Sequence, residues 1–596
     1  MVKINPNDFY NNKIRNCKKS LKQIEQKTSI FLYCKLLFFA LFVASFVVWI
    51  YYSKDNMFWL YGTIGFMIYI LFMHLDSRVI EKQRFIKKQV IVLSNELRNL
   101  SGIFTYDDGS KYISSNHPFT FDIDIFGQGS LFHRINRTIT VEGANKLAKT
   151  LSNVGIDKEK IQQRQAAISE LTHLTEFRIS FQCIGEGNKP IGYNNIVIEP
   201  EKLNISLLKW IVRISWCVTA IAFFTLVIIT FLNISTVVPL TILMISICIN
   251  GMFSIYFFYR SGKIINRIDS LIKCVLQYSP VLELYSKNNF DSKLLNEIKA
   301  EFTEQKKSVL KLRHINELFH FRNNAILWVL ANCLFILDIY AVLKFLLWEK
   351  QNLSKLPQLF TSVAHLDALV SLANYNFNHP NTTLPQFTEK GIDAQCVYHP
   401  FIMTRNIVGN DYVQEENSIS IITGANMSGK STFLRAIALN LILSNAGCKV
   451  FAEKFAFNPQ IKLFTSMRTQ DNITIGKSYF NAEIDRLSHA IDYNLSNYPT
   501  LLILDEVLKG TNSEDKLQGT LELLDFFSKQ GFMAIVATHD IGVTLLEKEY
   551  GESKFKNYCF EIELNNPIVY TYKLFRGICK NRNASYILSH MLSTKK

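Results

Sequence analysis

The residues best suited to chemistry form one glycine-rich segment, ISIITGANMSGKST, at positions 419–432. Two glycines followed by Lys430 and Ser431 fit the G-x-x-x-x-G-K-[ST] pattern of phosphate-binding loops. In such a loop the backbone N–H groups and the following helix N-terminus bind phosphate oxygens, the lysine faces the β- and γ-phosphates, and the serine offers an oxygen to Mg²⁺. An apolar run precedes the turn and helical spacing follows over 433–443, which is the context the pattern requires. The predicted nucleotide-binding residues are Gly424, Ala425, Asn426, Met427, Ser428, Gly429, Lys430, Ser431 and Thr432.

Two further apolar runs end in polar residues. LLILDE at 501–506 ends in two carboxylates, and AIVATHD at 534–540 contains His539 near its end. We expect Asp505 to hold Mg²⁺ together with Ser431, and Glu506 to orient or deprotonate the attacking water. A single histidine is more often a hydrogen-bonded structural residue, but ligands bind at the carboxyl ends of such strands, so we predict that His539 senses the γ-phosphate. The sequence therefore predicts ATP and Mg²⁺ as cofactors, with Lys430, Glu506 and His539 as catalytic residues.

The motifs together resemble the ATPase domain of the MutS mismatch-repair family, whose phosphate loop reads TGPNMGGKST. Asn426 and Met427 occupy the positions of the family's Asn-Met. DNITIGKSYFNAE at 471–483 is similar to the family signature D-D-x-x-x-G-x-S-T-F-x-x-E, LKGTNS at 508–513 resembles G-R-G-T-S-T, and Thr538-His539 matches the family's Thr-His. Few other ATPases combine these motifs.

The resemblance extends upstream of the ATPase motifs. Residues 122–171 look like the start of the MutS helical core domain, and residues 366–385 resemble its last helix and exit. His399-Pro400 and Asn410-Asp411 match short family motifs that enter the ATPase domain. The similarity covers roughly 120–180 and 260–596.

The resemblance implies a homodimer that forms through the ATPase domains. In that family the serine of the signature segment reaches the nucleotide of the opposite subunit. The corresponding residue here is Ser478, beside Gly476 and Lys477. The alternative is that Ser478 serves only as a helix N-cap. If the family role applies, hydrolysis requires the dimer.

The chain also departs from the family pattern. Mismatch-reading members carry an N-terminal domain with a Phe-x-Glu wedge, and no segment here fits it. The family's clamp also lacks room, and Ile407 stands about where the family has an aromatic residue near the adenine. Double-stranded DNA can still be bound through its backbone by a positive surface, for which 82–88 and 306–313 are candidates. The alternatives for these stretches are solvated helix faces or lipid-headgroup contacts.

Composition and hydropathy point to a membrane. The chain has 596 residues, of which 48% are hydrophobic, and a formal net charge of +15. Apolar runs at 31–52, 57–75, 211–232 and 237–259 are each long enough to cross a hydrocarbon layer of about 30 Å. They predict two transmembrane hairpins. A cleaved signal peptide is a weaker interpretation of the first run because a second span follows at once. The 11 cysteines form no C-x-x-C pair, which indicates a reducing compartment.

The basic residues predict the orientation of the chain. Lysines and arginines follow the first hairpin and flank the second, whereas the external connections are short and nearly uncharged. The positive-inside rule then places both termini and the ATPase domain in the cytoplasm, and we expect a bacterial inner-membrane location. A fifth apolar run, 326–348, carries Asp338 and Lys344. If it crossed the membrane, the ATPase segment would lie outside, so we predict a buried helix of a soluble domain.

The predicted fold is an α/β P-loop ATPase domain of the ABC-type, MutS-like class, preceded by an all-α core domain, with two transmembrane helical hairpins. The predicted segments are a basic N-terminus at 1–30, hairpin 1 at 31–75, the first core part at 76–206, hairpin 2 at 207–260, lever and core helices at 261–385, and the ATPase domain at 386–596.

Three functions are compatible with this organisation. The first is a membrane-anchored MutS-like ATPase that binds mismatched, damaged or branched DNA in a repair or DNA-handling role. The second is an ATP-driven membrane scaffold or remodelling protein that binds no DNA. The third, a transporter of the related ABC class, is disfavoured because the chain lacks an LSGGQ-type signature and has only four spans.

Overall fold

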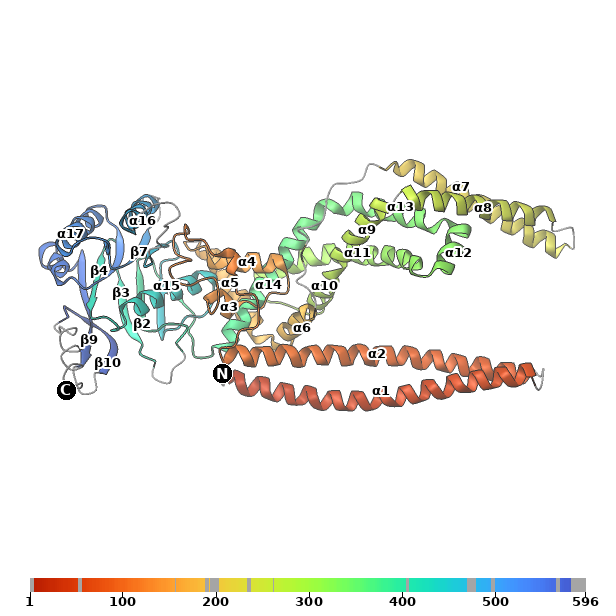
Figure 1. The fold of residues 1–596 in the computed structure, drawn as a ribbon, viewed down its shortest axis with the longest axis horizontal. Coiled ribbons are helices and arrows are strands. Elements are labelled where there is room, and N and C mark those ends of the chain that lie inside the picture. Colours follow the sequence, from red (N-terminus) through yellow and green to blue (C-terminus); the bar gives the residue numbers. More distant parts are fainter. Residues whose placement is uncertain are drawn as a thin grey trace. The chain divides into compact units, whose positions relative to one another are not determined.

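The computed structural model describes residues 5–51, 56–155, 157–187, 192, 203–232, 237–260, 262–402, 407–468, 479–494, 499–563 and 569–579. The chain forms two compact units. Unit 1 comprises Met1–Arg137, Asn145–Ile179 and Ala368–Lys596, and unit 2 comprises Thr138–Ala144 and Ser180–Asp367. A helical N-terminal region precedes a mixed α/β region in the sequence, which confirms this division of the fold (Figure 1).

A six-stranded sheet forms the centre of the α/β region, with strand order β10-β9-β4-β8-β7-β6. All neighbouring strands are parallel except β9 and β10. The strands β4 and β8 are buried along their whole length, as expected for a parallel sheet covered on both faces. The strands are β4 (Ile419–Gly424), β6 (Lys462–Ser466), β7 (Thr500–Asp505), β8 (Met533–Thr538), β9 (Phe555–Glu563) and β10 (Val569–Arg576).

A smaller sheet has the strand order β1-β5-β2-β3. In the sequence, β1, β2 and β3 precede the first strand of the larger sheet, and β5 lies between β4 and β6. Its strands are β1 (Gln386–Phe387), β2 (Ile392–Val397), β3 (Asn410–Gln414) and β5 (Lys454–Phe457). The helices of this region are α15 (Lys430–Ala446), α16 (Tyr479–Asn494), α17 (Ser513–Lys529), η5 (Ile541–Leu545) and α18 (Leu546–Tyr550).

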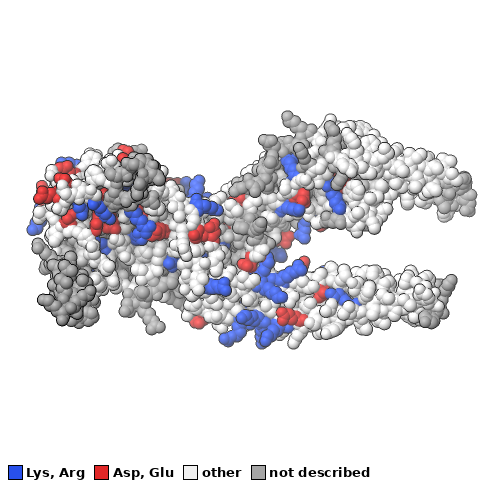
Figure 2. Space-filling view, in the orientation of Figure 1, with Lys and Arg blue, Asp and Glu red and all other residues white. Residues whose placement is uncertain are grey.

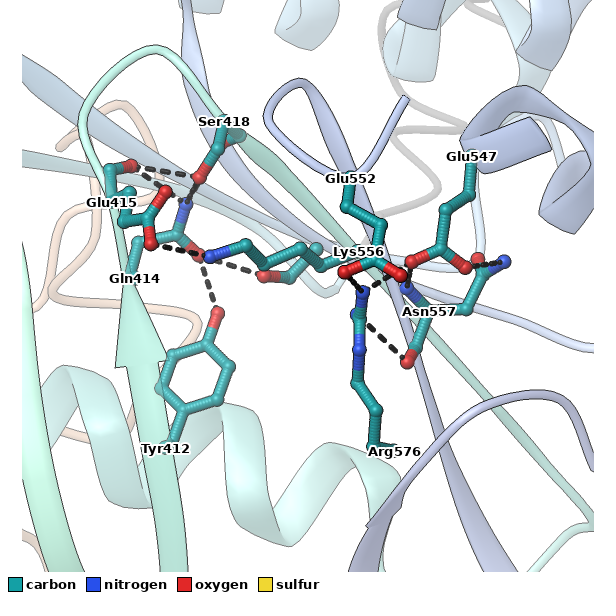
Figure 3. Close-up of polar contacts among 10 residues, drawn as sticks. Tyr412, Gln414, Glu415, Ser418, Glu547, Glu552, Lys556, Asn557 and Arg576 are labelled. Carbon is teal, nitrogen blue, oxygen red and sulfur yellow. Dashed lines mark hydrogen bonds and ion pairs between the residues drawn. The ribbon is translucent and has the colours of Figure 1, made fainter. Parts of the chain in front are cut away.

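Polar contacts connect β3 to β4 and brace β9 against β10 (Figure 3). The Gln414 amide donates to the Ser418 carbonyl oxygen at 2.8 Å, and the Ser420 hydroxyl donates to the Gln414 side-chain oxygen at 3.0 Å. Arg576 of β10 binds Glu547 of α18 and donates to the carbonyl oxygen of Asn557 in β9. These contacts fix β10, which contributes to the site described below.

Unit 1 also contains helices from the first part of the chain. They are α1 (Pro6–Tyr51), α2 (Asn56–Leu100), η1 (Ser110–Tyr112), α3 (Leu131–Ile135) and α5 (Lys158–His173). The helices α4 (Val141–Leu151), α6 (Thr175–Gly185) and α14 (Leu356–Asn378) contribute residues to both units.

The helices α1 and α2 pack against each other as a long antiparallel hairpin (Figure 1). Figure 2 shows lysines and arginines over the part of this hairpin nearest the rest of unit 1, whereas its far part is almost uncharged. Lys35 and Asp76 form an ion pair of 2.5 Å where the apolar part begins. Each apolar part is exposed and long enough to cross a membrane.

Unit 2 contains the second apolar pair, α7 (Ile205–Phe231) and α8 (Val237–Arg260), which are also long and apolar enough to cross a membrane. Its other helices are α9 (Gly262–Gln277), α10 (Ser279–Ser286), α11 (Lys293–His320), η2 (Phe321–Asn323), α12 (Ala325–Phe335), α13 (Leu337–Asn352) and η3 (Leu353–Lys355).

The fifth apolar run differs from its prediction as one buried helix. It breaks at Ile336, which has a left-handed φ of 42° and separates α12 from α13. Most residues of α13 are buried, as predicted, but most of α12 is exposed. The prediction was therefore wrong for the first half of the run.

A buried ion pair attaches the base of the first hairpin to the rest of unit 1. Glu96 of α2 accepts from the Arg137 guanidinium at 2.7 Å, and both side chains are almost fully buried. Asn378, at the end of α14, donates to the second Glu96 oxygen at 2.8 Å and accepts from the Tyr10 hydroxyl at 2.8 Å. The charge of Arg137 is thus compensated inside the fold, and both hairpin helices are held by the same asparagine.

We expect Glu96→Ala to destabilise unit 1 by about 3–5 kcal/mol, because it leaves the Arg137 charge buried without its partner. The measurement is the thermal unfolding midpoint of the detergent-purified protein. Glu25→Ala, which removes an exposed carboxylate from α1, is the matched control. Equal midpoints for the two variants would contradict a structural role for the buried pair.

Candidate functional site

The glycine-rich segment forms the connection between β4 and α15. Gly424 ends the strand with φ 151°, and Gly429 precedes the helix with φ 111°. A Cβ atom on Gly424 would lie 2.8 Å from the Phe560 carbonyl oxygen, so this position has no room for a side chain. The N-terminus of α15 begins at Lys430, which gives a helix dipole directed at the loop.

Lys430 folds into the loop itself. Its Nζ donates to the carbonyl oxygens of Gly424 and Ala425 at 2.8 and 2.9 Å. Burial lowers the pKa of this lysine, and the nearby Glu506 and Asp505 carboxylates oppose that effect. The ammonium group therefore lies at the loop with acidic groups close by.

Ser431 and Asp505 lie in direct contact. The Ser431 hydroxyl donates to an Asp505 carboxylate oxygen at 2.6 Å. One hydroxyl and one carboxylate suit Mg²⁺, which takes few protein ligands and completes its shell with phosphate and water. In the same loop, the buried Ser428 hydroxyl has no hydrogen-bond partner among the described residues. A phosphate oxygen would provide the acceptor that this hydroxyl lacks, so the loop fits a nucleotide phosphate.

Glu506 and His539 form the second polar pair of the site. His539 Nε2 lies 2.8 Å from a Glu506 oxygen, and Lys430 Nζ lies 3.4 Å from the same nitrogen. The hydrogen bond from His539 lowers the pKa of Glu506 to about 2, so the carboxylate is ionised. Glu506 has a left-handed φ of 57°, and its N–H donates to the Ala537 carbonyl oxygen at 2.9 Å. The strained backbone is thus held by the neighbouring strand β8.

The structure brings Lys430, Ser431, Asp505, Glu506 and His539 together at one edge of the sheet. Ser478, Gly476 and Lys477 lie outside the described residues. The end of the same signature segment is described, however, and it contains Glu483, which sequence analysis did not single out. Its two carboxylate oxygens accept from the N–H groups of Leu508 and Lys509 at 2.7 and 3.0 Å. Glu483 therefore fixes the loop that follows Glu506, and its place in the family signature was the available signal.

A cavity of about 360 Å³ adjoins the phosphate loop. It is lined on the loop side by Gly429 and Thr432, and elsewhere by Ile407, Phe433, Phe560 and Tyr572. Ile407 thus lies at the cavity, as its position in the sequence suggested. The aromatic residue that sequence analysis missed is Tyr572, which lies in an irregular stretch of β10 with φ 51°. No sequence pattern marks this residue.

Residues of the upstream segment brace the site from within unit 1. Asp124 binds Arg435 of α15 at 3.0 Å and Arg468, which follows β6, at 2.6 Å. Asp122 accepts from the Thr465 hydroxyl at 2.8 Å. The helix that starts at the phosphate loop is therefore attached to the segment before α3.

Comparison with known proteins agrees with these motifs. Residues 420–590 match the family model MutS domain V. The C-terminal part of this chain belongs to the MutS family. It is 32% identical over 232 residues to DNA mismatch repair protein MutS of Thermotoga maritima, covering 38% of this chain and 29% of that protein. It is 34% identical over 236 residues to the MutS of Finegoldia magna, covering 38% and 27%, respectively.

The similarity includes a eukaryotic relative. The chain is 29% identical over 244 residues to human MutS protein homolog 4, covering 39% of this chain and 25% of that protein. This chain thus spans less than a third of the length of each of these MutS relatives. The family relation is confirmed for the MutS domain V region.

We expect Tyr572→Ala to weaken ATP binding, because a base in the cavity would lose an aromatic stacking surface worth roughly 1–3 kcal/mol, or about 5- to 150-fold in Kd. The measurement is a titration with a fluorescent ATP analogue. Phe575→Ala, on the same strand but outside the cavity lining, is the control and should bind normally. Equal affinities of the two variants would place the base elsewhere.

Proposed function

We propose that this chain is a membrane-anchored MutS-like ATPase that binds and hydrolyses ATP with Mg²⁺ and acts on DNA. The observation that carries the ATPase proposal is the clustering of two polar pairs, Ser431–Asp505 and Glu506–His539, around Lys430. The match to MutS domain V supports the same activity.

The residues of the site would have different roles in binding and hydrolysing ATP. The loop N–H groups and Lys430 would bind the phosphates, and Lys430 would exchange its carbonyl acceptors for phosphate oxygens. Ser431 and Asp505 would hold Mg²⁺, which neutralises developing charge on the phosphates when bound. A carboxylate with a pKa of about 2 is a weak proton acceptor, so Glu506 is better suited to orienting the attacking water than to deprotonating it. His539 would hold Glu506 in place and lie near the γ-phosphate.

We extend the proposal to a homodimer on the family resemblance. Ser478 of one chain would contact the nucleotide bound by the other chain. Glu483 supports this role indirectly, because it links α16, which directly follows the signature serine, to the loop after Glu506. Rearrangement of the signature segment would therefore change the position of Glu506, which is proposed to orient the attacking water.

The membrane part of the proposal rests on the four apolar helices. Their exposed side chains are aliphatic and aromatic over stretches of membrane-spanning length. Exposed apolar surfaces of this size mark contact with a membrane or with another protein. If both hairpins span a bacterial inner membrane, the ATPase region and both ends of the chain would lie in the cytoplasm.

DNA is proposed as the partner because the named MutS relatives are DNA mismatch repair proteins. The basic part of the first hairpin offers a surface for it (Figure 2). Its exposed cations include Arg15, Lys18, Lys19, Lys22, Lys82, Arg84 and Lys87. Such a surface would contact phosphates of double-stranded DNA without reading bases. The competing function is an ATP-driven membrane scaffold without DNA binding, which the same basic surface would serve by contacting lipid headgroups.

Glu506→Gln should lower the ATP hydrolysis rate by about 10²-fold, because the amide places an N–H donor where a carboxylate oxygen would accept from the attacking water and so misorients it. ATP affinity should remain near that of the unmodified protein, since Glu506 is not among the loop residues. Phosphate release and nucleotide binding are measured in parallel. Glu514→Gln, an exposed change in α17, is the control. Full hydrolysis by the Glu506 variant would exclude the proposed site.

Replacing Lys18 and Lys22 by glutamine should weaken duplex binding. The slope of log K against log salt should become shallower by about 0.9 for each DNA phosphate that the variant no longer neutralises. The measurement is binding of matched, mismatched and branched duplexes to the detergent-purified protein at two salt concentrations, with and without ATP. Lys529 and Lys548, exposed in the α/β region, are changed to glutamine as a control of equal charge. Intact ATPase activity without DNA binding by the unmodified chain would favour the membrane-scaffold function.

A further inference from the structure

The helix α12 exposes an apolar surface that no described part of unit 2 covers. Its sequence, AILWVLANCLF, contains no charged residue. Five of its side chains are between 47% and 73% exposed: Ile326, Leu327, Val329, Leu330 and Phe335. A helix of 11 residues is about 16 Å long, which is too short to cross a hydrocarbon layer of about 30 Å.

Side chains of the second hairpin bind the C-terminal end of α12. Asn250 of α8 donates to the Cys333 carbonyl oxygen at 3.1 Å, and Trp216 of α7 donates its indole N–H to the Phe335 carbonyl oxygen at 2.8 Å. Gly251 lies beside Cys333, where an added Cβ would come within 3.2 Å of its sulfur. The end of α12 is therefore fixed to the hairpin itself.

The contact with Asn250 sets the level of α12 along the hairpin. The apolar stretch of α8 runs from Leu240 to Phe257. Asn250 lies seven residues before its end, which corresponds to about 10 Å along a helix. If α8 spans the membrane, Cys333 lies inside the hydrocarbon layer rather than above it.

Three of the last four carbonyl groups of α12 have hydrogen-bond partners, which a lipid environment requires. The last carbonyl groups of a helix lack intrahelical partners, and in hydrocarbon no water replaces them. Here the Asn332 carbonyl oxygen accepts from the Ile336 N–H at 3.0 Å, while Cys333 and Phe335 have the hairpin donors. At the other end, the Asn324 side chain accepts from the N–H groups of Ile326 and Leu327.

Both flanks of α12 meet on one side. Arg322, before the helix, donates to Asp338, after it, at 2.8 Å, and Trp328 donates to the second Asp338 oxygen at 2.8 Å. The following helical segment is bent by 79° from α12 at Ile336. The chain thus enters and leaves α12 at a single ion pair.

We propose that α12 is a re-entrant helix whose exposed face contacts lipid acyl chains in the leaflet beside the cytoplasmic ends of α7 and α8. The inference rests on the proposed membrane anchoring. Lipid is the occupant because α12 is fixed to α7 and α8, whose own exposed side chains are apolar and include Ile221 and Met252. A re-entrant helix leaves the number of complete spans even, so the ATPase region stays on the cytoplasmic side. It also fixes the adjoining ends of α11 and α13 at the membrane.

The test places the photoreactive amino acid p-benzoylphenylalanine at one position at a time in the full chain. Position 330 reports on α12, position 221 on the lipid face of α7, and position 307 on the exposed surface of α11. The chain is reconstituted in vesicles of phosphatidylethanolamine and phosphatidylglycerol and irradiated, and adducts are identified by mass spectrometry. Position 326 repeats the α12 measurement if the variant at 330 does not accumulate.

Phospholipid adducts at 330 and 221, with none at 307, are expected. Lipid adducts at 221 combined with none at 330 and 326, or with adducts there to a second copy of the chain, would overturn the re-entrant helix and leave the membrane anchor intact. The absence of lipid adducts at 221 would instead overturn the membrane anchoring.

Discussion

The parallel register of β4, β8 and β7 is the constraint on which the candidate site depends. Thr423 pairs with Thr538, and Asp505 pairs with Ala537, so the three strands end at the same edge. Residues that follow these ends are brought together although they are far apart in sequence. The hydrogen bond between Ser431 and Asp505 is the direct result. If the register of one strand shifted by one residue, neither the Ser431–Asp505 pair nor the Glu506–His539 pair would form. The side chains of that strand would then point to the opposite face of the sheet.

The sequence predicted this part of the structure well because each motif marks the end of an apolar strand. Lys430, Asp505, Glu506 and His539 lie where the motifs indicate, although their roles remain predictions. Tyr572 could not be predicted, since its position at the cavity depends on an irregularity in β10 and on a positive φ. The ion pair between Glu96 and Arg137 could not be predicted either. No sequence pattern links the two segments, and the pair forms only because folding buries both residues together.

The run at 326–348 shows where hydropathy stops being informative. Its composition is the same whether it forms a buried helix, a span or two helices. The break at Ile336 is set by tertiary contacts: the Asp338 N–H binds the Asn332 side chain, and the Asp338 carboxylate binds Arg322. A β-branched residue with positive φ is strained and persists only where its surroundings determine it. The charged residue that argued against a membrane span is therefore the residue that shapes the turn.

Within unit 1, the phosphate loop and the first hairpin share a short connecting segment. Arg435 lies on the helix that begins at Lys430, and it binds Asp124. The same segment continues to Arg137, which is paired with Glu96 of α2 inside the fold. A ligand shifts the equilibrium between two conformations only if it binds them with different affinities. These contacts alone therefore do not couple nucleotide binding at the loop to movement of the hairpin. They do require that any displacement of α15 be accommodated either at Asp124 or at the buried Glu96–Arg137 pair. The partly exposed Asp124 contact is the less costly one to change.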